Sequence, residues 1–136
     1  MTTRVIPTKV HAIVDAVTGP TLVAAPNVGG FDDSAGSALP ARAVGGGAAV
    51  LSALTDYELG LVRLVPMRVH LALDAMNGAL LAAMPWVSRS AKRGKRYWLP
   101  HAIVGATEIA LALTTKTRPP RAARARTLLS TVTRAL

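Results

Sequence analysis

The sequence predicts an all-α protein: a four-helix transmembrane bundle built from two parallel helical-hairpin repeats, which cross the membrane in the same direction. Three observations support this fold class. One pattern occurs twice, four apolar runs have the length of membrane helices, and the charged residues lie mostly between these runs. Of the 136 residues, 51% are hydrophobic and 17% are charged, and the mean hydropathy is +0.36. This balance is too apolar for an ordinary small soluble domain.

The duplication is clearest in residues 6–28 and 65–87, which align at a constant offset of 59 without a gap. Ten of the 23 aligned positions are identical, and both copies contain a His-x-x-x-Asp motif. The segments that follow also match at this offset, so the repeated unit is a pair of helices. The later identities are Ala43/Ala102, Gly46/Gly105, Ala53/Ala112, Leu54/Leu113 and Thr55/Thr114.

The repeats define one membrane domain over residues 1–116, with repeat 1 at about 6–55 and repeat 2 at about 65–114. Each apolar run is near the roughly 20 residues that a helix needs to cross a bilayer. Residues 117–136 form a basic tail, in which apolar residues at helical spacing predict a helix on the membrane surface or a solvated end. The apolar runs cover residues 7–28, 39–55, 66–87 and 98–115.

Prolines and glycines locate the helix ends and the helix contacts. Prolines are expected at the starts of the helices, where a missing N–H costs nothing, and these are Pro7, Pro40, Pro66 and Pro100. Pro26 and Pro85 should kink or end the first and third helices. Small residues allow two helix backbones to approach closely, and we expect this of Gly45–Gly47, of Gly105 with Ala106, and of the pair Gly19/Gly78.

The net charge of +9 does not indicate nucleic-acid binding, because the basic residues lie between the apolar runs and in the tail. The first connection, residues 29–38, contains Asp32 and Asp33 and no basic residue, whereas both ends of the chain are basic. The positive-inside rule therefore predicts a multi-pass protein of the cell inner (cytoplasmic) membrane with cytoplasmic termini, although the basic loop 89–96 opposes this orientation.

Arg42 is expected to pair with Asp32 or Asp33. Expected partners are the lipid bilayer, anionic headgroups at the tail, and a second copy or another membrane protein.

Six ionisable residues inside the apolar runs form the candidate polar network. His11 and Asp15 are four residues apart, as are His70 and Asp74, so each pair shares a helix face. Ionisable groups inside membrane helices normally face the bundle interior, and all three carboxyl groups are expected near the membrane midplane. The fourth helix adds His101 and Glu108, seven residues apart, where the second helix has Arg42 and Ala49.

Three interpretations of this network remain open. It can be a structural hydrogen-bond network that fixes helix register, a proton or cation relay, or a metal or haem site in which His11 and His70 meet. The structural interpretation is preferred, so no metal and no cofactor is predicted. The sequence contains no cysteine and no catalytic or phosphate-binding motif, and we do not expect an enzyme.

The repeat, the Met84-Pro85-Trp86 ending and the WLPHAIVGATEIALALTT helix together resemble the SPW-repeat family of small bacterial integral membrane proteins. The resemblance covers most of residues 5–116 and implies membrane location and two helical hairpins, without an assigned activity. In that family a Ser-Pro-Trp motif ends the first helix of each repeat, at the positions of Pro26 and Pro85. Here neither copy keeps the serine, and Trp86 is kept only in the second. The predicted function is therefore a structural or interaction role in the membrane, and the alternative is a proton- or cation-conducting bundle.

Overall fold

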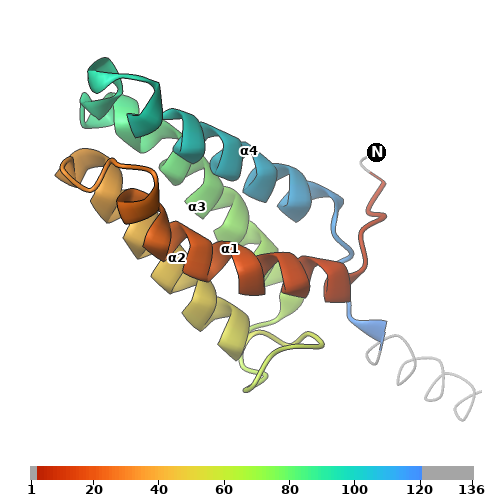
Figure 1. Ribbon diagram of the computed structural model, residues 1–136. Helices are drawn as coiled ribbons and strands as arrows, with labels where there is room; N and C mark the ends of the chain where they lie inside the picture. The colour runs from red at the N-terminus through yellow and green to blue at the C-terminus, as the bar shows by residue number, and fades with distance from the viewer. Residues whose placement is uncertain (1–2, 121–136) are drawn as a thin grey trace, which may run out of the picture.

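The computed structural model describes residues 3–120, which form a bundle of four α-helices (Figure 1). The prediction of an all-helical four-helix bundle is confirmed, with each helix within a few residues of its expected apolar run. The predicted surface helix of the tail lies largely outside the described residues. The helices are α1 (Thr8–Val28), α2 (Ala35–Leu54), α3 (Met67–Val87) and α4 (Leu99–Thr114), and two short 3₁₀ turns, η1 (Ser90–Arg93) and η2 (Lys95–Tyr97), precede α4.

The bundle consists of two hairpins, with α1 packed along α2 and α3 packed along α4. The α1–α2 and α3–α4 connections lie at one end, called the loop end here. The segment before α1, the α2–α3 connection and the end of α4 lie at the other, called the threonine end (Figure 1). Helices α2 and α3 make the main helix-to-helix contact between the hairpins.

A glycine crossing holds each hairpin together. A Cβ atom added to Gly45 would lie 2.6 Å from the carbonyl oxygen of Gly19, and one added to Gly78 would lie 2.7 Å from that of Gly105. Both distances are shorter than any real Cβ contact, so the backbones touch where only glycine fits. A Cβ on Gly46 would meet nothing within 4 Å, so the close approach involves only the first of the three consecutive glycines.

These crossings correct the alignment of the second half of the repeat. Gly19 and Gly78 are 59 residues apart, but their partners Gly45 and Gly105 are 60 residues apart. The pairing of α2 with α4 at offset 59 is therefore wrong by one residue, because the path from α3 to α4 contains one more residue than that from α1 to α2. The structural counterparts of His101 and Glu108 are then Ala41 and Ala48, in place of Arg42 and Ala49.

Pro26, Pro40 and Pro85 all lie inside helices. Pro40 does not begin α2, which starts five residues earlier at Ala35. A proline inside a helix leaves the carbonyl four residues earlier without its usual donor, and this carbonyl, on Gly36, accepts a hydrogen bond from Ser88 Oγ at 3.1 Å. Pro26 and Pro85 lie within the last turn of α1 and α3, which end two residues later.

The bundle exposes many large apolar side chains and buries several polar ones beside two apolar clusters. The fully buried side chains include histidine, threonine and serine, while every helix exposes large apolar residues. On α1 and α3 the exposed large apolar residues include Val10, Ile13, Val17, Val69, Leu73, Met76 and Leu80, and on α2 and α4 they are Leu39, Val50, Leu99, Ile103 and Leu113.

Candidate functional site

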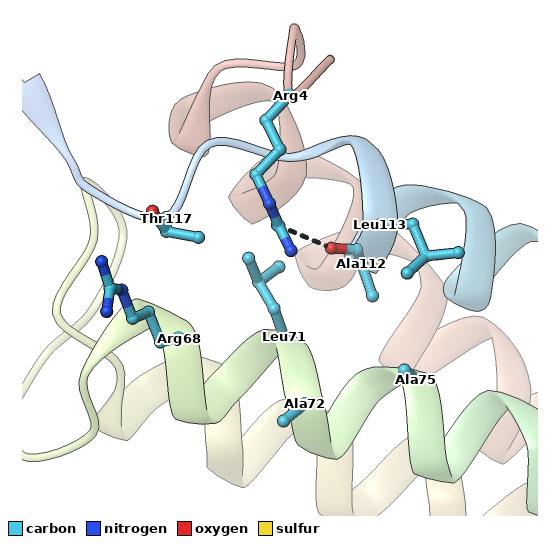
Figure 2. A pocket seen from close by; sticks show the side chains of 8 residues that line it. All are labelled: Arg4, Arg68, Leu71, Ala72, Ala75, Ala112, Leu113 and Thr117. Carbon is cyan, nitrogen blue, oxygen red and sulfur yellow. Dashed lines mark hydrogen bonds between the residues drawn. The ribbon is translucent and has the colours of Figure 1, made fainter. Parts of the chain in front are cut away.

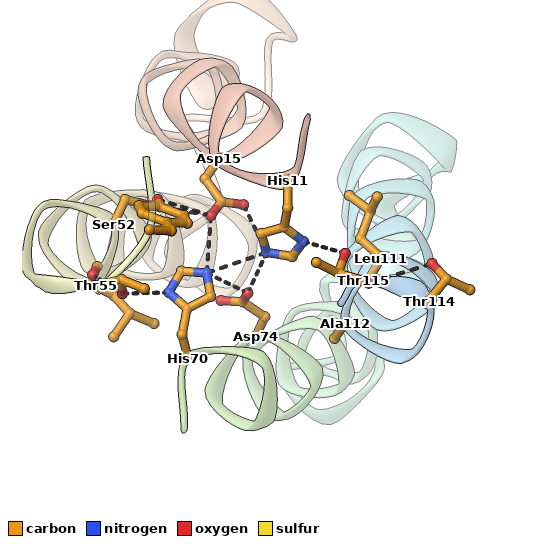
Figure 3. Close-up of polar contacts among 12 residues, drawn as sticks. His11, Asp15, Ser52, Thr55, His70, Asp74, Leu111, Ala112, Thr114 and Thr115 are labelled. Carbon is orange, nitrogen blue, oxygen red and sulfur yellow. Dashed lines mark hydrogen bonds and ion pairs between the residues drawn. The ribbon is translucent and has the colours of Figure 1, made fainter. Parts of the chain in front are cut away.

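Four of the six predicted polar residues meet at the threonine end, between α1 and α3 (Figure 3). His11 and Asp15 lie one turn apart on α1, and His70 and Asp74 lie one turn apart on α3. None of the four residues is more than 4% exposed. We call these four residues the His/Asp cluster.

The His/Asp cluster has contacts from one hairpin to the other as well as contacts within each helix. His11 Nε2 lies 2.9 Å from Asp74 Oδ2, and His70 Nε2 lies 3.0 Å from Asp15 Oδ2. The contacts within one helix are 3.4 Å for His11 to Asp15 and 2.9 Å for His70 to Asp74. The two Nε2 atoms are 3.3 Å apart. Each imidazole therefore faces both carboxylates, an arrangement that the spacing along a single helix does not reveal.

A threonine from the opposite hairpin supports the far side of each imidazole (Figure 3). His70 Nδ1 lies 2.8 Å from Thr55 Oγ1 at the end of α2, and His11 Nδ1 lies 2.9 Å from Thr115 Oγ1 at the end of α4. Neither threonine was predicted to belong to the network, because the alignment at offset 59 pairs Thr55 with Thr114. At the corrected offset of 60, Thr55 and Thr115 are equivalent, and this identity is the signal that would have found them.

Short backbone pairings place these threonines beside the histidines. Ile6, just before α1, pairs with Thr115, and Val65, just before α3, pairs with Thr55. The threonine end of one hairpin is thus joined to the chain that enters the first helix of the other. Both threonines are fully buried.

Tyr57 and Ser52 add two weaker contacts to Asp15 Oδ2, at 3.3 Å from the Tyr57 hydroxyl and 3.5 Å from Ser52 Oγ. Burial raises the pKa of Tyr57 above its ordinary value, and the nearby Asp15 carboxylate raises it further, so the phenol stays protonated and donates to Asp15. Tyr57 is buried, with its ring 5.3 Å from that of His70.

The remaining two predicted network residues lie apart from the cluster. His101 Nε2 donates to the carbonyl oxygen of Ser37 at 2.7 Å, and its ring lies 5.3 Å from that of Phe31 near the loop end. Its Nδ1 atom is buried without a partner among residues 3–120. Glu108 is buried beside Gly78, where its Cβ atom packs against the helix crossing, and the described residues provide it no hydrogen bond.

Polar contacts at the loop end are partly exposed. Arg93 Nη2 lies 2.7 Å from Asp33 Oδ2, which also accepts a hydrogen bond from the Tyr97 hydroxyl at 3.1 Å. Slight burial raises the pKa of Asp33, but the Tyr97 hydrogen bond and the Arg93 charge outweigh it and hold the pKa below its ordinary value. Arg42 does not pair with either aspartate as predicted, because its Nη2 atom donates to Asn27 Oδ1 at 3.0 Å.

The proline-tryptophan positions also lie near the loop end. Pro26 and Pro85 are both buried, and Trp86 is half exposed, with its ring 5.4 Å from that of Trp98. These residues thus shape the ends of the first helix of each hairpin and contribute no group to the His/Asp cluster.

A surface pocket lies between α3 and α4 at the threonine end (Figure 2). Arg4 crosses it and donates from Nη1 to the carbonyl oxygens of Ala112 at 3.0 Å and Thr115 at 2.7 Å, which are unsatisfied groups at the end of α4. The Arg4 guanidinium thus holds the backbone of a residue that supports the His/Asp cluster. The pocket is lined by Arg4, Arg68, Leu71, Ala72, Ala75, Ala112, Leu113 and Thr117.

The His/Asp cluster has the chemistry to hold positive charge away from water. Two imidazoles and two carboxylates converge, and one ligand atom from each residue lies within 4.8 Å of the other three. Such a set can share protons between histidine and aspartate, or it can bind a metal ion.

Comparison with known proteins identifies a family. No curated protein and no solved structure matches the chain. A family model described as the SPW repeat domain matches residues 9–115, which include the four helices from the second residue of α1 onward and the whole His/Asp cluster. The chain therefore belongs to the SPW repeat family, as its proline-tryptophan ending and its repeat predicted.

Proposed function

We propose that this protein is a multi-pass protein of the cytoplasmic membrane with a structural or interaction role, in which the His/Asp cluster joins two helical hairpins. The observation that carries the proposal is that all four helices expose large apolar side chains, while histidine and aspartate side chains are buried between the helices. Large exposed apolar surfaces on a folded protein mark contact with lipid or with another protein. Membership of the SPW repeat family supports membrane location.

Hydropathy supports membrane location most directly for α2. Among the helices of residues 3–120, α2 is the one that is both long and apolar enough to cross a membrane by length and composition. Helix α4 has only 16 residues, and α1 and α3 carry the buried His and Asp residues that lower their hydropathy. A polar residue that faces the interior of a bundle does not prevent insertion, since it is shielded from lipid.

The role of the His/Asp cluster follows from its position. Lipid is as apolar as the helix surfaces, so the hydrophobic effect does little to hold two hairpins together in a membrane. Reciprocal hydrogen bonds between α1 and α3 supply an attraction that holds the two hairpins together. They also fix the register of one hairpin against the other. The exposed apolar surface of the bundle then remains available for lipid, a second copy or another membrane protein.

The proposed orientation places the threonine end in the cytoplasm. The basic residues of the described chain at this end include Arg4, Lys9, Arg68, Lys116 and Arg118, and the tail adds more. Basic residues within a few turns of a membrane helix favour the cytoplasmic side and attract anionic headgroups. At the loop end, Asp33 pairs with Arg93 and reduces the opposing positive charge.

Insertion and orientation are testable together, because the sequence has no cysteine and each single-cysteine variant therefore has one thiol. The protein should remain in the membrane fraction after carbonate extraction. In intact cells an impermeant thiol reagent should label Asp32→Cys at the loop end and should label Leu61→Cys at the threonine end only after lysis. Recovery in the carbonate supernatant would refute membrane insertion, and the reverse labelling pattern would invert the orientation.

A proton or cation path is the second candidate function, favoured by the four ionisable groups in contact within the His/Asp cluster. Within residues 3–120, however, no hydrogen bond links the cluster to Glu108 or His101. Proton flux into liposomes should therefore be no greater than in empty vesicles. A wild-type flux that disappears in a folded Asp74→Asn variant would favour the conducting function over the structural one.

A further inference from the structure

We propose that His11, Asp15, His70 and Asp74 bind one divalent first-row transition-metal ion of the Zn²⁺ type. The proposal rests on the joined hairpins of the preceding section, since each hairpin supplies one histidine and one aspartate. No single hairpin has more than two of the four ligands.

The spacing of the ligand atoms suits a tetrahedral ion. With metal–nitrogen and metal–oxygen bonds of about 2.0–2.1 Å, two ligand atoms of a tetrahedron lie about 3.3 Å apart. The two Nε2 atoms are 3.3 Å apart, and the contacts between Nε2 and carboxylate oxygens are between 2.9 Å and 3.4 Å. All four ligand atoms lie within 4.8 Å of one another, so coordination requires a side-chain movement of about 1.5 Å at most.

The hydrogen bonds around His70 orient its ring for metal binding. Thr55 Oγ1 donates its one proton to the carbonyl oxygen of Leu51 at 2.6 Å, so it can only accept from His70 Nδ1. The proton of a neutral His70 therefore lies on Nδ1, and the lone pair of Nε2 points into the cluster. Ligating histidines usually donate their second N–H in this way, which fixes both the tautomer and the ring orientation.

Similar support exists around His11 and Asp15. His11 Nδ1 contacts Thr115 Oγ1, and Arg4 holds the backbone carbonyl of Thr115. Tyr57 and Ser52 contact Asp15 Oδ2, which leaves the other oxygen of that carboxylate for an ion. A shell of outer hydrogen bonds is typical of a built metal site.

Charge and donor chemistry select the class of ion. Two aspartates and two neutral imidazoles carry a charge of −2, and a divalent cation neutralises them in a buried position where unbalanced charge is costly. Two nitrogen and two oxygen donors suit Zn²⁺, Fe²⁺, Co²⁺ or Mn²⁺, whereas Mg²⁺ and Ca²⁺ prefer six or more oxygens. A haem does not fit, because the two Nε2 atoms face each other at 3.3 Å with the carboxylates beside them.

The test uses the full-length protein in detergent, stripped with a chelator and titrated with Co²⁺. We expect one Co²⁺ per chain, the intense visible absorption of a tetrahedral Co²⁺ site, displacement by Zn²⁺ and no displacement by excess Mg²⁺. A folded wild-type protein that gives no such spectrum would overturn the proposal.

Matched variants locate the site. Thr55→Val leaves all four ligands in place and should weaken Co²⁺ binding by about 10- to 100-fold, the usual effect of removing an outer-shell partner. His70→Ala and Asp74→Asn should weaken it further. Glu108→Gln and His101→Gln alter a buried carboxyl group and a buried imidazole outside the cluster and should bind Co²⁺ as the wild type does.

The outcomes separate this proposal from the proposed function. A protein that stays in the membrane with native helical content but binds no Co²⁺ refutes only the metal site. Unchanged Co²⁺ binding by His70→Ala also refutes it, since the ion would then bind elsewhere. If Asp74→Asn does not fold, the wild-type spectrum and Thr55→Val still decide the question.

Discussion

The two ends of the bundle join the hairpins in different ways. At the threonine end the joint is reciprocal and buried: His11 contacts Asp74 and His70 contacts Asp15, and each hairpin contributes the same residue types. At the loop end the two hairpins contribute different residue types. His101 of α4 donates to the backbone carbonyl of Ser37 on α2, and Arg93 of η1 pairs with Asp33 before α2.

This difference shows where a duplicated chain keeps its symmetry. His11 contacts His70, its counterpart in the other repeat. A change in one of two such residues alters the partner of the other, so both copies retain the same residue. A residue that meets a different group is free to diverge. Ala41 and His101 are equivalent positions, and only the second carries a polar side chain. The comparison predicts a larger and more symmetric mutational response at the threonine end.

The largest effect should come from removing one carboxylate of the cluster. Asp74→Ala should lower the free energy of unfolding by about 3 kcal/mol, because two buried imidazoles lose a partner. Asp15→Ala should cost a similar amount, and Asp74→Asn less, since the amide oxygen still accepts. Thermal unfolding in detergent measures all three. A several-fold difference between the two alanine variants would contradict the reciprocal arrangement.

A second test compares the cluster with the crossing inside a hairpin. Gly45→Ala should cost about 2 kcal/mol, because the new Cβ would overlap the Gly19 carbonyl oxygen and force the helices apart. Gly46→Ala is the matched control in the adjacent position. It meets nothing within 4 Å and should stabilise α2 by up to about 1 kcal/mol. Equal losses in both variants would mean that the crossing lies elsewhere.

At the loop end, His101→Ala should cost about 1 kcal/mol, through loss of the hydrogen bond to Ser37 and of packing against Phe31. The loss is expected to be smaller than that of Asp74→Ala, because only one partner is left unsatisfied. The same unfolding measurement checks this order, and a larger loss for His101→Ala would reverse the comparison of the two ends.

The smallest effect concerns the exposed contact of Asp33 with Arg93 and Tyr97. Because the pKa of Asp33 is lower in the folded protein than in the unfolded chain, this contact adds stability above the ordinary aspartate pKa and loses it as the pH falls. Below about pH 4 the free energy of unfolding of the wild type should no longer exceed that of Asp33→Asn. Unfolding of both proteins from pH 6 downward measures this difference. A difference in the free energy of unfolding that stays constant at all pH values would exclude the ionised contact.

Much of the fold could be predicted from the sequence, because apolar length and a repeat fix the helices and their order. The four members of the cluster were also identified, since buried charge inside an apolar run is costly and therefore informative. What the sequence did not reveal was the partner of each group. Spacing along a helix places His11 beside Asp15, but the cross-hairpin contact with Asp74 depends on how α1 and α3 meet.

His101 shows most clearly what could not be predicted from the sequence. Its spacing from Glu108 predicted a shared face and a place in one network, but its position near the start of α4 places it by the loop end, away from the cluster. Thr55 and Thr115 were missed for another reason. One additional residue between α3 and α4 shifts the repeat, and an ungapped alignment continued to give coincidental matches after the shift.

The backbone pairing of Ile6 with Thr115 has a consequence for how such a chain can be connected. Lys116 donates its N–H to the carbonyl oxygen of Ile6, just as Asp56 donates to that of Val65. The two hairpins are therefore joined at two places and form a closed ring. The α2–α3 connection is a covalent link, whereas the equivalent link from the end of α4 to the segment before α1 is made only by hydrogen bonds. A circular permutant that links residue 116 to residue 6 and opens the chain at residues 60–61 should keep the same bundle. By the same logic, a single hairpin of this type has the contacts to form the bundle as a homodimer.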